Sequence, residues 1–200
     1  MRITGGELRG RHVRVPKTEV RPTQDRVREA LFNMLGDRTP GCRFLDLFAG
    51  SGAVGIEAWS RGAATVCWVE SHPRSLAALR QNVTELCPLA GPVLGVDVRV
   101  CLKKGLAPGP HDIIFCDPPY EKGGPERGRR RSAEPWLPTL LRVVREAGIL
   151  ATDGLLIMEQ AADEAGAMAG GWAQIDDRVY GGTRLRFYRL ASPTASEEGG

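Results

Sequence analysis

The sequence lacks long hydrophobic runs. Its apolar stretches stop well short of the ~20 residues that a membrane-spanning helix needs, and its first residues lack the apolar core of a secretory signal peptide. We therefore expect a cytoplasmic protein that does not associate with membranes. With 200 residues, of which 42% are hydrophobic and 26% charged, the chain suits one ordinary globular domain.

The sequence also lacks paired cysteines. Its five cysteines are odd in number and form no CxxC pair, and Cys67 and Cys116 lie inside apolar runs. Buried free thiols are the natural interpretation of this pattern. We expect neither disulfides nor a metal site.

Two common phosphate-binding signatures are missing as well. No GK[ST] follows a glycine-rich loop, and the glycines near residue 50 do not fit GxGxxG in its usual register. A dinucleotide or a nucleoside triphosphate is therefore less favoured as a ligand than another compound that carries adenosine.

The sequence has little net charge, because 27 basic and 24 acidic residues leave only +3. The distribution is nevertheless uneven. Residues 1–28 contain eight basic and three acidic residues, and a second basic cluster follows residue 120. Such clusters favour a polyphosphate partner, with a solvated charged surface as the alternative. The candidate contacts to this partner, which the family resemblance described below implies to be RNA, are Arg9, Arg11, Arg26, Arg28, Arg129 and Arg130.

The sequence begins with a weak alternation in residues 1–15, which fits a short hairpin or an extended arm, and a clear helix follows it. Thr23 is a helix-capping residue, and apolar residues from Val27 to Leu35 recur on one helical face before Gly36. Arg26 and Arg28 are predicted to point away from that apolar face and to extend the basic arm.

From residue 42 onward strands and helices alternate, which predicts an α/β fold with a mainly parallel sheet. The last two strands flank Gly181 and Gly182, which predicts an antiparallel hairpin at one edge of the sheet. We expect an N-terminal basic arm and helix at residues 1–38, a main domain at 39–191 and a disordered tail at 192–200. The predicted strands are residues 42–48, 65–70, 92–97, 111–116, 153–159, 173–179 and 183–190, and the predicted helices after the first are 52–61, 73–86, 98–104, 134–147 and 160–169.

Two of these strands end in loops that carry candidate chemistry. The first continues into Ala49-Gly50-Ser51-Gly52, where the glycines let a ligand lie against backbone amides. The strand ending at Cys116 continues into Asp117-Pro118-Pro119-Tyr120. In open parallel sheets, ligands bind at the carboxyl ends of the strands near the point where strand order reverses, so both loops are expected to open there. Glu70 ends the second strand, where an acidic side chain accepts hydrogen bonds from ribose hydroxyls, and Asp97 ends the third, where it could accept from an adenine amino group.

The second loop suits methyl transfer to an exocyclic amine of a base. The lone pair of such a nitrogen is delocalised into the ring, and hydrogen bonds accepted from its two N–H groups aim that lone pair at the methyl donor. Asp117 and the backbone carbonyl of Pro118 are predicted to accept them, and the two prolines stiffen the loop. Tyr120 offers a ring on which the base can stack. The alternative to this catalytic interpretation is that residues 117–120 form an ordinary turn in which Tyr120 only packs against its neighbours.

These residues resemble a known family. The pairing of DLFAGSG with DPPY is similar to the Rossmann-like class I S-adenosylmethionine-dependent methyltransferases that act on exocyclic amines of nucleic-acid bases. Residues 21–35, RPTQDRVREALFNML, and residues 180–185, YGGTRL, resemble the RsmD family, which methylates N2 of a guanine in bacterial 16S ribosomal RNA. The resemblance implies S-adenosylmethionine as cofactor and ribosomal RNA or the small ribosomal subunit as partner. It implies cofactor contacts from Asp46, Ala49, Gly50, Ser51, Gly52, Glu70, Asp97, Arg21 and Thr23, and guanine contacts from Asp117, Pro118 and Tyr120.

Three other functions remain open from the residues. A DNA adenine-N6 or cytosine-N4 methyltransferase also uses DPPY, but the chain has no room for a separate target-recognition domain. A protein glutamine-amide methyltransferase would not need the basic arm. A nucleic-acid-binding module without activity would not need Asp117 and Tyr120. We expect a monomer.

Overall fold

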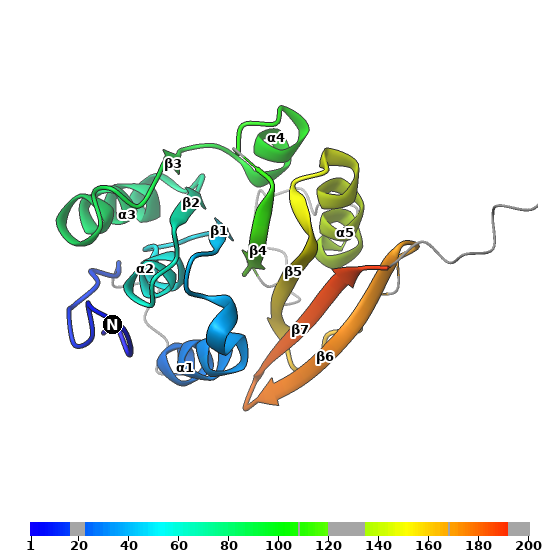
Figure 1. Cartoon of the computed structure of the whole chain (residues 1–200), viewed down its shortest axis with the longest axis horizontal. Coiled ribbons are helices and arrows are strands. Elements are labelled where there is room, and N and C mark those ends of the chain that lie inside the picture. Colours follow the sequence, from blue (N-terminus) through cyan, green and yellow to red (C-terminus); the bar gives the residue numbers. More distant parts are fainter. Residues whose placement is uncertain (17–22, 108, 120–134, 168, 192–200) are drawn as a thin grey trace, which may run out of the picture.

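The structure, a computed structural model, describes residues 1–16, 23–107, 109–119, 135–167 and 169–191 (Figure 1). Seven strands form one sheet with the order β3-β2-β1-β4-β5-β7-β6. The first five strands run parallel, and β7 is antiparallel to both β5 and β6. The predicted sheet with an antiparallel C-terminal hairpin is confirmed. The strands are β1 Arg43–Leu47, β2 Thr65–Val69, β3 Val93–Leu94, β4 His111–Cys116, β5 Leu150–Ala161, β6 Trp172–Tyr180 and β7 Thr183–Leu190.

Helices cover both faces of the sheet because the central strands are apolar on both sides. In β1, Phe44 packs into the core on one face and Leu45 into the core on the other, as the two-residue period of a strand requires. The first core contains α1, α2 and α3, and the second contains α4 and α5 (Figure 1). The helices are α1 Thr23–Leu35, α2 Ala53–Ser60, α3 Pro73–Leu86, α4 Val98–Lys103 and α5 Trp136–Ala147, with a 3₁₀ turn at Gly36–Arg38.

Local sequence explains most of these helices. In α5, Leu137, Leu140, Leu141 and Val144 recur every three or four residues, and all four are buried. Helix α3 begins with Pro73, whose missing N–H costs nothing at the first helical position. No helix in the described part of the chain is long and apolar enough to cross a membrane.

The predicted helix at residues 160–169 is wrong. Strand β5 continues to Ala161, because Gln160 and Ala161 pair with Arg184 and Thr183 of β7. This alanine-rich stretch has good helix propensity, but pairing with a strand more than twenty residues away outweighs it. The third strand is also shorter than predicted, since β3 contains only Val93 and Leu94.

The first residues form a hairpin, which is one of the two predicted alternatives. The Ile3 amide donates to the Arg11 carbonyl at 3.0 Å, the Val13 amide donates to the Met1 carbonyl at 3.0 Å, and Arg2 bridges His12 in antiparallel fashion. Ile3 and Val13 are buried in the same core as α1 and α2. This N-terminal hairpin, residues 1–14, is therefore packed against the sheet domain.

The prediction for Arg28 is wrong. Its side chain is only 3% exposed, and its Nε donates to Glu57 Oε2 at 3.2 Å, within a salt bridge that joins α1 to α2. The Arg28 guanidinium also donates to the Arg2 carbonyl in the hairpin. Arg28 therefore holds three elements together and does not extend the basic surface.

Candidate active site

The site is built where β1 and β4 lie side by side at the centre of the sheet. After β1 the chain turns to α2 and β2 on one side, and after β4 it turns to α5 and β5 on the other. Leu47 is paired with Cys116, and the Asp117 amide lies 3.4 Å from the Leu47 carbonyl. The glycine loop, residues 48–52, and the acceptor loop, which begins at Asp117, therefore leave adjacent strand ends. This is the position where this class of sheet binds ligands.

The glycine loop has a shape that ordinary residues resist. Phe48, Gly50 and Gly52 have φ values of 62°, 55° and 84°, in the left-handed region. A Cβ on Gly52 would lie 2.4 Å from Leu79 Cδ1. Glycine at position 52 thus lets α3 pack closely while the loop turns into α2.

Asp46 is a buried carboxyl group at the base of this loop. It accepts a hydrogen bond from the Gly55 amide at 2.9 Å. The pKa of Asp46 is raised to about 8, mainly by burial and also by the charges of Asp117 and Glu70, although the Gly55 hydrogen bond lowers it. Three carboxyl groups from three neighbouring strand ends therefore act on one another electrostatically, which makes this edge of the sheet favourable for a cation.

Glu70 ties the end of β2 to the glycine loop. Its two carboxylate oxygens accept from the Gly50 amide at 2.8 Å and from the His72 amide at 2.6 Å. The side chain is buried at the predicted strand end. Each oxygen retains a further lone pair, so a ribose hydroxyl could still donate to it.

Ser51 connects the glycine loop to the N-terminal arm. The Asn82 side-chain amide on α3 donates to the Ser51 carbonyl and to the Arg14 carbonyl, each at 2.9 Å. The Asn82 oxygen accepts from the Arg14 amide at 3.0 Å. The arm therefore reaches the glycine loop at Arg14, shortly before the predicted contacts Arg21 and Thr23. The structure does not describe Arg21 or the side chain of Thr23.

Asp97 has a structural role. Its exposed side chain caps α4 by accepting from the Arg99 amide at 2.9 Å and from the Val100 amide at 3.3 Å. An adenine contact from the same carboxylate stays a prediction.

Asp117 and Pro118 follow β4 directly. Asp117 is half-buried and Pro118 is buried. Tyr120, the third predicted guanine contact, and the predicted RNA contacts Arg129 and Arg130 lie outside the described residues. Among the described RNA candidates, Arg9, Arg11 and Arg26 are exposed.

Three residues near the site were missed from the sequence. Phe48 and Trp136 pack edge to face with ring centroids 4.8 Å apart, and the Arg99 guanidinium lies 3.8 Å from the Trp136 ring centroid. They come from three distant segments, so no local pattern joins them. The available signal was a tryptophan at the start of a helix directly after the basic stretch.

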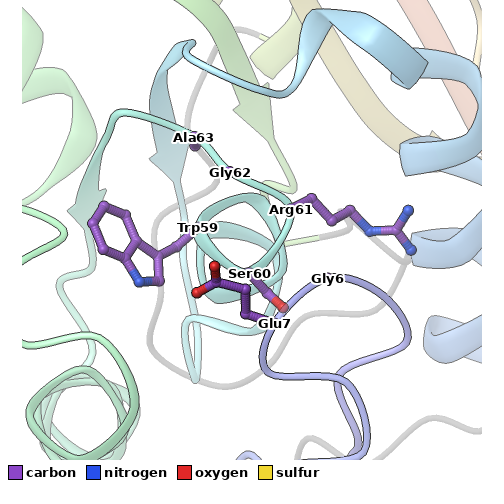
Figure 2. A pocket seen from close by; sticks show the side chains of 7 residues that line it. All are labelled: Gly6, Glu7, Trp59, Ser60, Arg61, Gly62 and Ala63. Atoms are coloured by element: carbon purple, nitrogen blue, oxygen red, sulfur yellow. The ribbon is translucent and has the colours of Figure 1, made fainter.

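A surface pocket lies elsewhere (Figure 2). It is lined by Gly6 and Glu7 of the hairpin and by residues 59–63 at the end of α2. Since the glycine loop precedes α2, this pocket lies at the opposite end of the helix and is not the candidate active site. Among the described residues, no cluster of histidine, cysteine or acidic side chains could hold a metal ion.

Comparison with known proteins places the chain in a family. The family described as "Conserved hypothetical protein 95" matches residues 1–189. The chain belongs to this family. One relative, "Ribosomal RNA small subunit methyltransferase D" of Escherichia coli (strain K12), is 33% identical over 200 residues, which cover 98% of this chain and 93% of the relative. Another, "Putative rRNA methyltransferase YlbH" of Bacillus subtilis (strain 168), is 32% identical over 193 residues, which cover 94% of this chain and 98% of the relative.

Solved structures agree with this placement. "Putative methyltransferase yhhF from Escherichia coli" superposes with a TM-score of 0.78 at 32% identity, covering 95% of this chain and 97% of that chain. SMU.776, a putative methyltransferase complexed with SAH, shares the fold with a TM-score of 0.62 at 19% identity, covering 86% of this chain and 50% of that chain. The resemblance to the RsmD family and the Rossmann-like class I methyltransferase fold are confirmed.

Proposed function

We propose that this protein transfers a methyl group from S-adenosylmethionine to the exocyclic N2 of a guanine in 16S ribosomal RNA. The coarser part of the proposal, methylation of ribosomal RNA with S-adenosylmethionine, follows from the family and from the names of its members. Guanine N2 comes from the resemblance of the motifs to the RsmD family. A monomer in the cytoplasm that acts on ribosomal RNA or on the small subunit completes the proposal.

One observation carries the proposal. The Asp117 amide lies 3.4 Å from the Leu47 carbonyl, one residue before Phe48 and the glycine loop begin. A donor held by the loop and an acceptor held by Asp117 would therefore share one edge of the sheet. Direct transfer between two bound molecules needs such closeness, because the methyl carbon must pass in line from sulfur to nitrogen.

The residues at the loop fit a bound S-adenosylmethionine. When bound, this cofactor supplies an activated methyl group on a positively charged sulfur. The carboxyl groups of Asp46 and Glu70 favour a cation nearby, and the absence of side chains at Gly50 and Gly52 leaves backbone open to a ligand. Glu70 would bind the ribose and Asp97 the adenine, and Ala49, Ser51, Arg21 and Thr23 would complete the contacts.

On the acceptor side, the protein positions the base and its lone pair. Asp117 and the Pro118 carbonyl would accept hydrogen bonds from the amine and turn its lone pair toward the methyl group. Tyr120 would stack on the base. No strong base is required, because the amine proton becomes acidic only after the methyl group has arrived.

The proposal predicts that Asp117→Ala abolishes methyl transfer. We expect turnover to fall at least ~100-fold, the size found when one preorganised polar contact to a reacting group is removed. Cofactor affinity, measured by calorimetry, should stay within about twofold. Asp112→Ala is the matched control, because Asp112 lies near the opposite end of β4 and pairs there with Arg43 at 2.8 Å. Unchanged turnover in Asp117→Ala would remove Asp117 from this role.

Substrate choice is tested separately. Labelled S-adenosylmethionine should methylate small ribosomal subunits that lack the modification and should leave duplex DNA unlabelled. Mapping the labelled nucleotide then tests guanine N2. Incorporation into duplex DNA, or into a protein glutamine, would support one of the rival methyltransferases. Absence of cofactor binding would support a binding module without activity.

A further inference from the structure

A partly exposed cluster of one cation and two aromatic rings lies beside the acceptor loop. Arg99 is the second residue of α4, Trp136 is the first residue of α5, and Phe48 follows β1. The Arg99 guanidinium carbon lies 3.8 Å from the Trp136 ring centroid, and Phe48 meets that indole edge to face at 4.8 Å. All three side chains are only half-buried.

The cluster lies next to Asp117. Phe48 follows Leu47, whose carbonyl faces the Asp117 amide across the β1–β4 pair. Phe48 and Trp136 pack against the core under α4 and α5, whereas Asp46 hydrogen-bonds to Gly55 of α2 on the other face of the sheet. The predicted methionine end of the cofactor and this cluster therefore flank Asp117 from opposite faces.

Arg99 has no acidic partner among the residues that the structure describes. Within the described residues its guanidinium forms no salt bridge, and the nearby Asp97 carboxylate is used by the backbone amides of Arg99 and Val100. Stacking on an indole occupies one face of the guanidinium and leaves its N–H groups, which point outward in the plane, for another ligand. The stack also fixes the side chain, so less entropy is lost when that ligand binds.

The chemistry of the cluster fits a phosphodiester better than the cofactor. S-adenosylmethionine contains no phosphate, and its carboxylate belongs to the methionine end, which is predicted to lie on the other face of the sheet. A planar guanidinium matches two phosphate oxygens. An RNA strand that delivers one base to Asp117 must lead its neighbouring phosphates past the rim of the same site. Unpaired RNA is typically held by such combinations of aromatic rings and arginine.

We propose that Arg99, held flat by Trp136 and backed by Phe48, binds the phosphodiester of the nucleotide next to the target base. The inference rests on the proposed function and adds a subsite to it. Arg99 and Trp136 would fix where the backbone of the strand lies and so align the base with Asp117. The phosphate contact would be independent of sequence.

The test compares Arg99→Gln, Arg99→Lys and Trp136→Leu with the wild type on 16S ribosomal RNA that lacks the modification. We expect Arg99→Gln to raise KM for RNA about tenfold, with kcat changed less than about threefold, and to reduce the slope of log Kd against log salt by about 0.7 to 1. Arg99→Lys should restore the salt slope but not the full affinity, because an ammonium lacks the planar fork. Trp136→Leu should weaken RNA binding in the same direction while the charge remains.

The matched control is Arg142→Gln, an exposed arginine on α5 that pairs with Glu146 at 3.3 Å. RNA binding by Arg99→Gln that equals that of the wild type and of Arg142→Gln would overturn the proposal. A rise in the calorimetric Kd for S-adenosylmethionine with unchanged RNA binding would overturn it too and assign the cluster to the cofactor. Wild-type methylation of the same RNA reports on the proposed function separately, so normal wild-type activity beside an unaffected Arg99→Gln would sink this inference alone.

Discussion

The carboxyl group of Asp46 has an environment that few acidic residues share. Its pKa is raised to about 8, mainly by burial and also by the negative charges of Asp117 and Glu70, and the Gly55 hydrogen bond offsets only part of this rise. Near neutral pH, Asp46 is therefore largely protonated and can respond to a cation bound beside it.

This response leads to a prediction about protons. The resemblance places Asp46 at the methionine end of the cofactor, whose sulfonium and ammonium groups lower the pKa of a neighbouring carboxyl group. A raised pKa that falls on binding means that a proton is released at pH values between the two. At pH 7 we expect release of up to about one proton per cofactor. Calorimetry in two buffers with different ionisation enthalpies measures it.

This prediction is tested with two conservative Asp→Asn variants, one at the predicted cofactor site and one away from it. Asp46→Asn should bind cofactor more weakly and release almost no proton. Asp112→Asn should release as much as the wild type, because hydrogen bonds from Arg43 hold the pKa of Asp112 below its ordinary value, where it is already ionised. Equal release by Asp46→Asn and the wild type would assign the proton to another group.

At the scale of elements, Glu57 joins the hairpin, α1 and α2. Its fully buried carboxylate accepts from the Thr4 amide at 2.9 Å, the Gly5 amide at 2.8 Å, Arg28 Nε at 3.2 Å and Arg61 Nε at 2.9 Å. Burial alone would raise the pKa of Glu57, but the hydrogen bonds from Thr4 and Arg61 and the charge of Arg28 hold it below its ordinary value. The group is thus a buried anion with a full set of donors.

Glu57→Gln should therefore be costly. The substitution removes the charge that balances two arginines and puts an N–H₂ group against their donors, so we expect a loss of about 3–5 kcal/mol. For a chain of this size that corresponds to a fall in Tm on the order of 10 °C. Thermal unfolding measures the loss, and hydrogen exchange shows where it acts. The amides of Ile3 and Val13 should exchange faster than those of β4.

The comparison variant is Glu85→Gln. Glu85 pairs with Arg14 at the surface, where both side chains are about half exposed, so the change should cost less than about 1 kcal/mol. Unchanged exchange at Ile3 and Val13 in Glu57→Gln would mean that apolar packing alone holds the hairpin.

The elements also show how far the sequence could lead. Helix α3 was predicted with its observed bounds because its apolar face and Pro73 are local signals. Local sequence could not predict where β5 ends, because that depends on pairing with β7. It could not predict the burial of Arg28 either, because that depends on the salt bridge with Glu57. The same division holds in the site.

In the site, the glycine loop and Asp117 were found because each follows an apolar strand directly. The register of β1 with β4 then brings their loops together. Phe48, Arg99 and Trp136 meet only through packing between three segments, and each looks ordinary in its own segment. Sequence patterns fix which residues stand at strand ends, whereas tertiary packing decides which other side chains join them.

At the scale of the whole molecule, the turn of the hairpin is separated from the glycine loop by the length of α2, whereas Arg14 at the end of the hairpin lies beside that loop through Asn82. The Glu7 amide donates to the Ser60 carbonyl at 2.8 Å, and the Leu8 amide donates to Ser60 Oγ at 2.9 Å. The hairpin turn thus lies at the end of α2, and the glycine loop lies at its start. Eight residues of helix separate the two by about 12 Å.

This separation predicts that the role of Arg9 and Arg11 depends on substrate size. The pair of changes Arg9→Gln and Arg11→Gln should weaken binding of whole 16S ribosomal RNA and reduce its salt slope by up to about two, because two phosphate contacts are lost. A strand limited to the target nucleotide and its immediate neighbours would not reach the hairpin turn, so its kcat/KM should be unaffected. Arg99→Gln, in contrast, should impair both substrates.

The matched control is the pair Arg142→Gln and Arg178→Gln, two exposed arginines outside the hairpin that pair with Glu146 and Asp176. It removes the same charge, so any loss caused by net charge alone would appear in it equally. If the Arg9 and Arg11 changes impaired the short strand as much as the whole RNA, the hairpin would act through the structure of the site. If they impaired neither, RNA would not follow α2 away from the active site, and the substrate would bind on the α4–α5 side alone.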